Sequence, residues 1–112
     1  MQKAIISALI FFAAIQAESA QAETFKGADF LTWPRHSQQL YIRTSVGMAG
    51  LIAAENDKVH ANCLEDWYFD DEERSTDFVL ETMRRFPEYH PRGVIVAVLE
   101  KQCGTFNYTE RQ

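Results

Sequence analysis

Apolar residues recur at helical spacing through most of the chain, and most regularly between residues 37 and 56. Ser37 can cap a helix there, and the pattern continues to about Asn56. Two separate rows of apolar positions follow the helical repeat, so the pattern predicts a central helix that is buried on two sides. One row consists of Leu40, Tyr41, Thr44, Met48, Leu51 and Ile52, and the other of Ile42, Val46, Ala49 and Ala53.

Two glycines, Gly47 and Gly50, lie inside this predicted helix. Each glycine in a helix interior costs roughly 1 kcal/mol relative to alanine. Their small size would let another helix approach closely, and we assign them this packing role.

Three shorter helical segments are predicted elsewhere. A turn of helix from Ala28 to Trp33 is stopped by Pro34, and a second helix is expected from Val59 to Phe69. The third runs from about Glu72 to Phe86, with acidic residues in its first turn and arginines in its last, as the helix dipole favours. Its predicted buried side chains are Phe78, Val79, Thr82, Met83 and Phe86.

The segment from Pro91 to Cys103 has the composition of a buried strand but the boundaries of a helix. Pro91 suits a first helical position, and Gly104 suits the position just past a helix end. No second strand candidate exists to pair with the segment, so we predict a helix. One face of this helix consists of Val94, Ile95, Val98, Leu99 and Gln102, with Cys103 beside it.

Residues 1 to 22 have the features of a cleaved export signal. An apolar run of about 14 residues, from Ala4 to Ala17, precedes Ala20-Gln21-Ala22, the small-x-small pattern that signal peptidase recognises. The run is shorter than the roughly 20 residues that a membrane-spanning helix needs. The alternative to an export signal is an N-terminal helix that is buried in the fold. We therefore expect cleavage between Ala22 and Glu23, and a periplasmic or secreted protein that is not anchored in a membrane.

Cys63 and Cys103 are the two cysteines, and both lie in the predicted mature domain, residues 23 to 112. Only one intramolecular pairing is possible, and an oxidising compartment favours it. A domain of roughly 90 residues has a small core that such a cross-link would stabilise. The alternatives, a reactive thiol or a metal pair, lack the local spacing that they need. We predict an all-α fold, a compact bundle of about four helices with one disulfide.

The chain is acidic, with a formal net charge of −5, so nucleic acid and anionic membranes are poor partners. Four acidic residues directly follow three consecutive aromatic residues in the sequence. A helix cannot bury three consecutive side chains on one face, so we expect Trp67 or Tyr68 in the core and another aromatic residue at the surface. Aromatic residues are frequent interface anchors, which makes this segment the candidate surface for a protein partner. A solvated helix start, with aromatic side chains covering the disulfide, is the alternative. The segment comprises Trp67, Tyr68, Phe69, Asp70, Asp71, Glu72 and Glu73.

Residue patterns typical of catalysis or of metal binding are missing from the sequence. The histidines at positions 36, 60 and 90 are scattered, and His60 with Cys63 is the nearest approach to a metal pair. The serines lack the context of a nucleophile elbow, and no glycine-rich phosphate loop is present. We therefore predict a non-enzymatic protein that uses neither a metal nor a cofactor.

Several short motifs follow one another along the chain: Tyr41-Ile42, Ala49-Gly50, Cys63-Leu64, the corner from Arg85 to Pro91, Val96 to Leu99, and Cys103. Their spacing resembles that of the Rap/Tai type of immunity protein. The resemblance covers roughly residues 40 to 104 and implies an exported helical domain in which Cys63 pairs with Cys103. It also implies that the protein neutralises a toxin, such as a peptidoglycan amidase, delivered into the periplasm by type VI secretion. A periplasmic housekeeping protein of the same fold is an alternative.

In size and layout, the chain is also similar to the HdeA type of acid-stress chaperone, which is small, exported, helical and held by one disulfide. This second resemblance implies client proteins as partners and a fold that loosens in acid, because carboxylates lose their charge as the pH falls.

Overall fold

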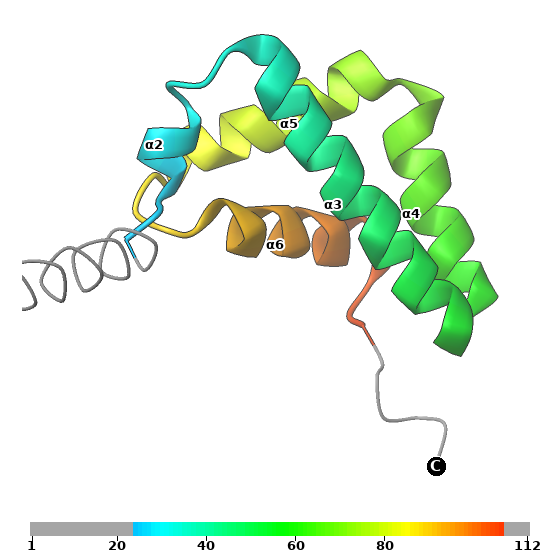
Figure 1. Ribbon diagram of the computed structural model, residues 1–112. Helices are drawn as coiled ribbons and strands as arrows, with labels where there is room; N and C mark the ends of the chain where they lie inside the picture. The colour runs from blue at the N-terminus through cyan, green and yellow to red at the C-terminus, as the bar shows by residue number, and fades with distance from the viewer. Residues whose placement is uncertain (1–23, 107–112) are drawn as a thin grey trace, which may run out of the picture.

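The computed structural model describes residues 24–106, so the predicted export signal and its cleavage site lie outside the described residues. Within that range the chain forms five helices and no strand (Figure 1). The all-α prediction is confirmed. The helices are α2 (Gly27–Phe30), α3 (Arg35–Asn56), α4 (Lys58–Asp70), α5 (Glu72–Arg85) and α6 (Pro91–Cys103).

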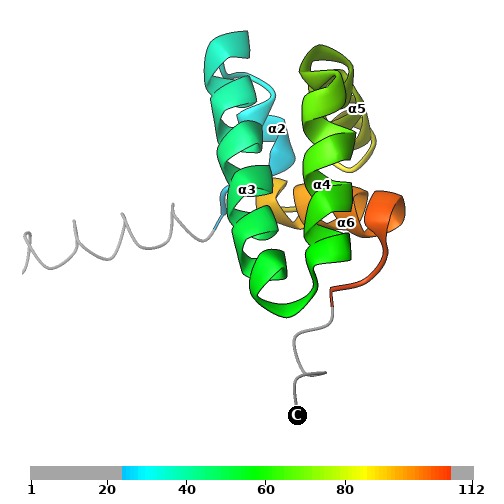
Figure 2. The ribbon, with the colours of Figure 1, turned by 90° about the vertical axis from the view of Figure 1, so that its right-hand side faces the viewer.

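Single aspartates separate α3 from α4 and α4 from α5. The carboxylate of Asp57 accepts hydrogen bonds from the backbone N–H groups of Val59 and His60, at 3.0 and 3.2 Å. The carboxylate of Asp71 accepts from the N–H of Arg74 at 3.1 Å. Each aspartate therefore satisfies otherwise unpaired donors at a helix start and allows a sharp turn. As a result, α3 and α4 lie side by side, and α6 crosses both of them (Figure 2).

The long helix begins earlier than its sequence predicts. Pro34, with extended backbone angles, stands at the N-cap position, and Arg35 is the first helical residue. The prediction that Ser37 caps this helix is wrong, because Ser37 lies within the first turn. The fixed φ of proline suits the entry to the helix without any side-chain cap.

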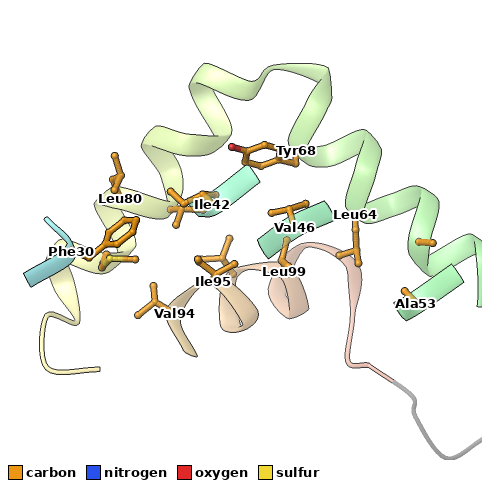
Figure 3. Close-up of a cluster of buried hydrophobic side chains, with 14 residues drawn as sticks. Phe30, Ile42, Val46, Ala53, Leu64, Tyr68, Leu80, Val94, Ile95 and Leu99 are labelled. Atoms are coloured by element: carbon orange, nitrogen blue, oxygen red, sulfur yellow. The ribbon is translucent and has the colours of Figure 1, made fainter. Parts of the chain in front are cut away.

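The core lies where α3, α4, α5 and α6 meet, and α2 closes one end of it. Tyr68 of α4 and Phe30 of α2 are the largest of its fully buried side chains. In Figure 3, Val46 of α3 and Leu99 of α6 point toward one another beneath Tyr68. Every helix thus contributes to one continuous apolar cluster.

Only one of the two apolar rows on α3 is buried. Ile42, Val46 and Ala53 are in the core, as the sequence predicts. Most of the other row is not covered: the exposed fractions are 50% for Leu40, 56% for Met48, 66% for Leu51 and 44% for Ile52. Tyr41 is the exception, because its ring packs against Phe30 and Trp33. The prediction of a helix buried on two sides is wrong for the described residues, since all the other helices lie on the same side of α3.

The core-facing side of α5 also differs from its prediction. Phe78 and Phe86 remain 41% and 49% exposed, although both were expected in the core. Small polar side chains of Ser75 and Thr76 take the buried positions instead, with Val79 and Met83. They can be buried because both hydroxyls have hydrogen-bond partners on α4.

The predicted disulfide is present. Cys63 of α4 is bonded to Cys103 at the end of α6, with the two Cα atoms 5.8 Å apart and a sequence separation of 40. The bond fastens α6, the last of the described helices, to α4. None of the described helices combines the length and apolar character needed to cross a membrane.

Candidate functional site

The three consecutive aromatic residues at the end of α4 go to different places. Tyr68 is fully buried, and its hydroxyl lies 3.0 Å from the hydroxyl oxygen of Thr76 on α5. Trp67 is half-buried and Phe69 is exposed. Because successive helical side chains are about 100° apart, Trp67 and Phe69 lie on different sides of α4. The aromatic run therefore does not form one surface.

Trp67 is paired instead with an aromatic residue of the next helix. Its ring and that of Phe78 meet edge to face, with their centroids 6.0 Å apart. The Ser75 hydroxyl donates a hydrogen bond to the Trp67 backbone carbonyl at 3.0 Å, which ties the two helices together at this point. The solvent-facing aromatic pair is thus formed across the α4–α5 contact. The sequence pattern had placed Phe78 in the core and so missed its part in the surface.

Three of the four acidic residues in the predicted binding segment have structural roles. Asp71 is the N-cap of α5. Glu72 accepts a hydrogen bond from the Arg43 guanidinium of α3, and Glu73 pairs with Arg35 at 2.9 Å. Asp77, one turn further along, pairs with Arg35 at 2.6 Å. Glu72, Glu73 and Asp77 thus link α5 to α3 within the molecule.

The ion pairs change the proton affinities of their members. The hydrogen bond from Arg43 is the main cause that holds the pKa of Glu72 below its ordinary value of 4.5. The hydrogen bond to Asp77 raises the pKa of Arg35, and burial raises the pKa of the Tyr68 phenol. Glu72 is therefore ionised in the folded protein at neutral pH, and Tyr68 is neutral.

Two exposed carboxylates next to Trp67 make no ion pair within residues 24–106. Asp66 precedes Trp67 directly, and Asp70 follows it after nearly one helical turn. Together with Phe78 they form what we call the aromatic–acidic surface: Asp66, Trp67, Asp70 and Phe78. Of the residues predicted to bind a partner, the structure brings only Trp67 and Asp70 into this surface. Asp66 was missed, although its position beside Trp67 is visible in the sequence.

A second surface feature lies between α3 and α6. It is an open groove of about 750 Å³, and its walls include Leu40, Met48 and Ile52 of α3 and Val96 of α6. The α3 residues belong to the uncovered apolar row, and Val96 of α6 lies across the groove from them. The sequence did not indicate a groove here because its pattern predicted that this row is buried.

The histidines have local structural roles or remain apart from one another. His90 caps α6 by accepting a hydrogen bond from the Arg92 N–H at 3.0 Å. His60 packs against the ring of Phe106, and its Nε2 atom is buried without a hydrogen-bond partner among the described residues. Over residues 24–106, no three His, Cys, Asp or Glu side chains converge as metal ligands would.

Comparisons with protein-family models, with curated proteins and with solved structures find no match for this chain.

Proposed function

We propose that the protein is exported to the periplasm and acts there without catalysis, by binding a protein partner at the aromatic–acidic surface. The observation that carries this proposal is the Trp67–Phe78 pair, which is partly open to solvent beside Asp66 and Asp70, two carboxylates that form no ion pair among residues 24–106. Neutralisation of a toxin, as the Rap/Tai resemblance implies, is the form of binding that we propose.

The chemistry of this surface fits a basic segment of the partner. Asp66 and Asp70 attract lysine or arginine side chains, and the Trp67 ring can accept a cation–π contact from the same groups. The formal net charge of −5 would also steer a basic protein toward the molecule. We therefore expect an association that weakens as the salt concentration rises.

Removing this surface should weaken capture of the partner. We expect the variant Asp66→Asn, Trp67→Ala, Asp70→Asn to bind the partner at least tenfold more weakly, since loss of one interface anchor costs about 2 kcal/mol or more. Both proteins are used as baits in a periplasmic extract, and a captured protein is then purified and titrated against each bait at low and high salt. Asp71 is left unchanged because its carboxylate caps α5.

The matched control removes two exposed acids and one aromatic ring elsewhere: Glu55→Gln, Glu88→Gln, Tyr89→Ala. It should capture the same protein with unchanged affinity. Equal binding by the triple variant and the wild type, or binding that does not respond to salt, would show that the aromatic–acidic surface does not hold the partner.

An acid-stress chaperone of the HdeA type is the second candidate function. Three ion pairs favour it: Arg35 with Glu73 and Asp77, and Arg43 with Glu72, all between α3 and α5. Because all three depend on ionised carboxylates, acid would weaken the link between these helices and open access to the core.

The stability of the fold should therefore fall in acid. Because the pKa of Glu72 is lower in the folded protein than its ordinary 4.5, its pair stabilises the fold above that pH. The contribution is lost as the pH falls through the folded-state pKa. In urea unfolding, Glu72→Gln should be less stable than wild type at neutral pH, with the difference shrinking toward pH 3, whereas Glu55→Gln should follow the wild type throughout. An unchanged difference at both pH values would contradict this role of Glu72.

The chaperone function itself is tested with a defined client. Alcohol dehydrogenase is unfolded at low pH with and without the protein, and its aggregation is followed by light scattering. If the protein does not suppress aggregation at a pH where its own fold has loosened, the chaperone hypothesis fails.

A further inference from the structure

The outer face of α3 is an apolar surface that no described part of the chain covers. Leu40, Met48 and Leu51 lie along it, and Ile52 leads from it into the groove beside α6. The large aliphatic side chains on this face and on the groove wall expose on the order of a few hundred Å² of apolar area, about as much as monomers ordinarily tolerate in one patch. A stable interface buries about 800 Å² on each partner, counting its apolar centre and its polar rim together. An apolar surface of this size can therefore form the centre of such an interface.

The two glycines of α3 differ in what they contact. A Cβ atom on Gly50 would lie 3.5 Å from the Glu65 side chain of α4, so Gly50 serves the close α3–α4 packing that its sequence position predicts. A Cβ atom on Gly47 would meet nothing within 4 Å. Packing inside the molecule thus gives no reason for Gly47, although glycine weakens a helix.

Gly47 lies on the uncovered face, at its centre. Leu40 precedes it by seven residues, Thr44 by three, and Leu51 follows by four. These are the spacings at which side chains of one helix line up along the contact with another helix. A glycine in the middle of such a row is where the backbones of two crossing helices could come closest.

Charge does not oppose the approach of an identical molecule at this face. Between Ser37 and Ala54, the only charged residue is Arg43, and its guanidinium is bound to Glu72 on α5. Glu55, which is exposed and follows Leu51 by four residues, adds one carboxylate at the C-terminal end of the face. The acidic residues of the chain lie mainly on the other helices. A face that is apolar except for one carboxylate at its end has little to select a strongly charged partner, and its apolar part is complementary to itself.

From these observations, we infer that the uncovered α3 face is where two copies of this chain associate. The two α3 helices would cross in antiparallel orientation at Gly47, about a twofold axis. Leu51 of each copy then packs between Leu40 and Thr44 of the other, and the apolar row that the sequence predicted as buried becomes buried in the dimer. The aromatic–acidic surface on α4 and α5 uses different residues, so this proposal does not depend on the proposed function.

The test measures the mass of the protein, purified from the periplasm, by sedimentation over a range of concentrations. Wild type should be in a monomer–dimer equilibrium. Gly47→Ala should raise the dissociation constant at least tenfold, because the added methyl separates the two helices. The same substitution should raise the monomer Tm by roughly 4 °C, because alanine favours a helix and the new Cβ meets nothing within the molecule.

Gly93→Ala is the matched control. Gly93 lies inside α6, and a Cβ added there would also meet nothing within 4 Å. This variant should gain thermal stability to a similar degree and keep the wild-type dissociation constant. A second variant, Leu51→Glu, places a charge on the face and should be monomeric, whereas Val59→Glu, at an exposed position of α4, should still form dimers.

A wild type that stays monomeric at its highest soluble concentration would overturn the proposal. So would a dimer whose dissociation constant is unchanged by both Gly47→Ala and Leu51→Glu, or one that the two glycine variants weaken equally. The bait assay measures partner binding by the aromatic–acidic surface, whereas sedimentation measures self-association through α3. Failure of the dimer proposal can therefore be distinguished from failure of the proposed function.

Discussion

Replacing Cys63 and Cys103 with alanine is expected to lower the free energy of unfolding by about 4 kcal/mol, the chain-entropy value for closing a loop of this length. The bond spans 40 residues and holds the end of α6 against α4. Small domains have only about 5–15 kcal/mol of net stability, so the loss should be visible as a large drop in the urea midpoint. Urea unfolding of the double alanine variant, followed by circular dichroism, measures it.

Two controls accompany this measurement. Wild type treated with a reducing agent should resemble the double variant, and the double variant should not respond to the same treatment. A double variant with the wild-type urea midpoint would mean that packing alone holds α6 in place and that the disulfide is dispensable.

Tyr68→Ala is expected to have the second large effect, a loss of about 3–5 kcal/mol, as for other large aromatic residues truncated in a core. Tyr68 is fully buried among α3, α4 and α5 (Figure 3), and its hydroxyl lies 3.0 Å from that of Thr76. Tyr68→Phe keeps the ring and removes only the hydroxyl, so it should cost about 1 kcal/mol. Both values come from equilibrium urea unfolding at neutral pH.

The neighbouring aromatic residue provides the control for this prediction. Phe69→Ala removes a ring that is exposed, and it should change the stability by about 1 kcal/mol or less. If Phe69→Ala were as damaging as Tyr68→Ala, the division of the aromatic run between core and surface would be wrong.

The positions of the helices were largely predictable because their boundaries are local. Pro91 and Gly104 mark the two ends of α6, and the acidic and basic ends of α5 agree with its dipole. The end of α3 near Asn56 and the pairing of the two cysteines were also predictable. Ser37 was mistaken for a cap because Pro34 suffices to begin the helix without a side-chain hydrogen bond.

The candidate site was only partly predictable. Sequence adjacency pointed to Trp67 and Asp70, but it could not show that Glu72 and Glu73 reach back to arginines on α3. It predicted that Trp67 or Tyr68 lies in the core but could not show that it is Tyr68, or that Phe78 joins Trp67 at the surface. Each of these outcomes depends on which helix packs beside which.

The sequence by itself determined the helices, the single possible disulfide and the acidic character of the chain, because each of these follows from local spacing or from composition. The tertiary structure decided which apolar rows are buried, since periodicity shows that a helix has an apolar face but not whether a neighbour covers it. On α3 the pattern predicted two buried faces, and the bundle covers one. The uncovered face, with Gly47 at its centre, could be recognised only after the other helices had been placed.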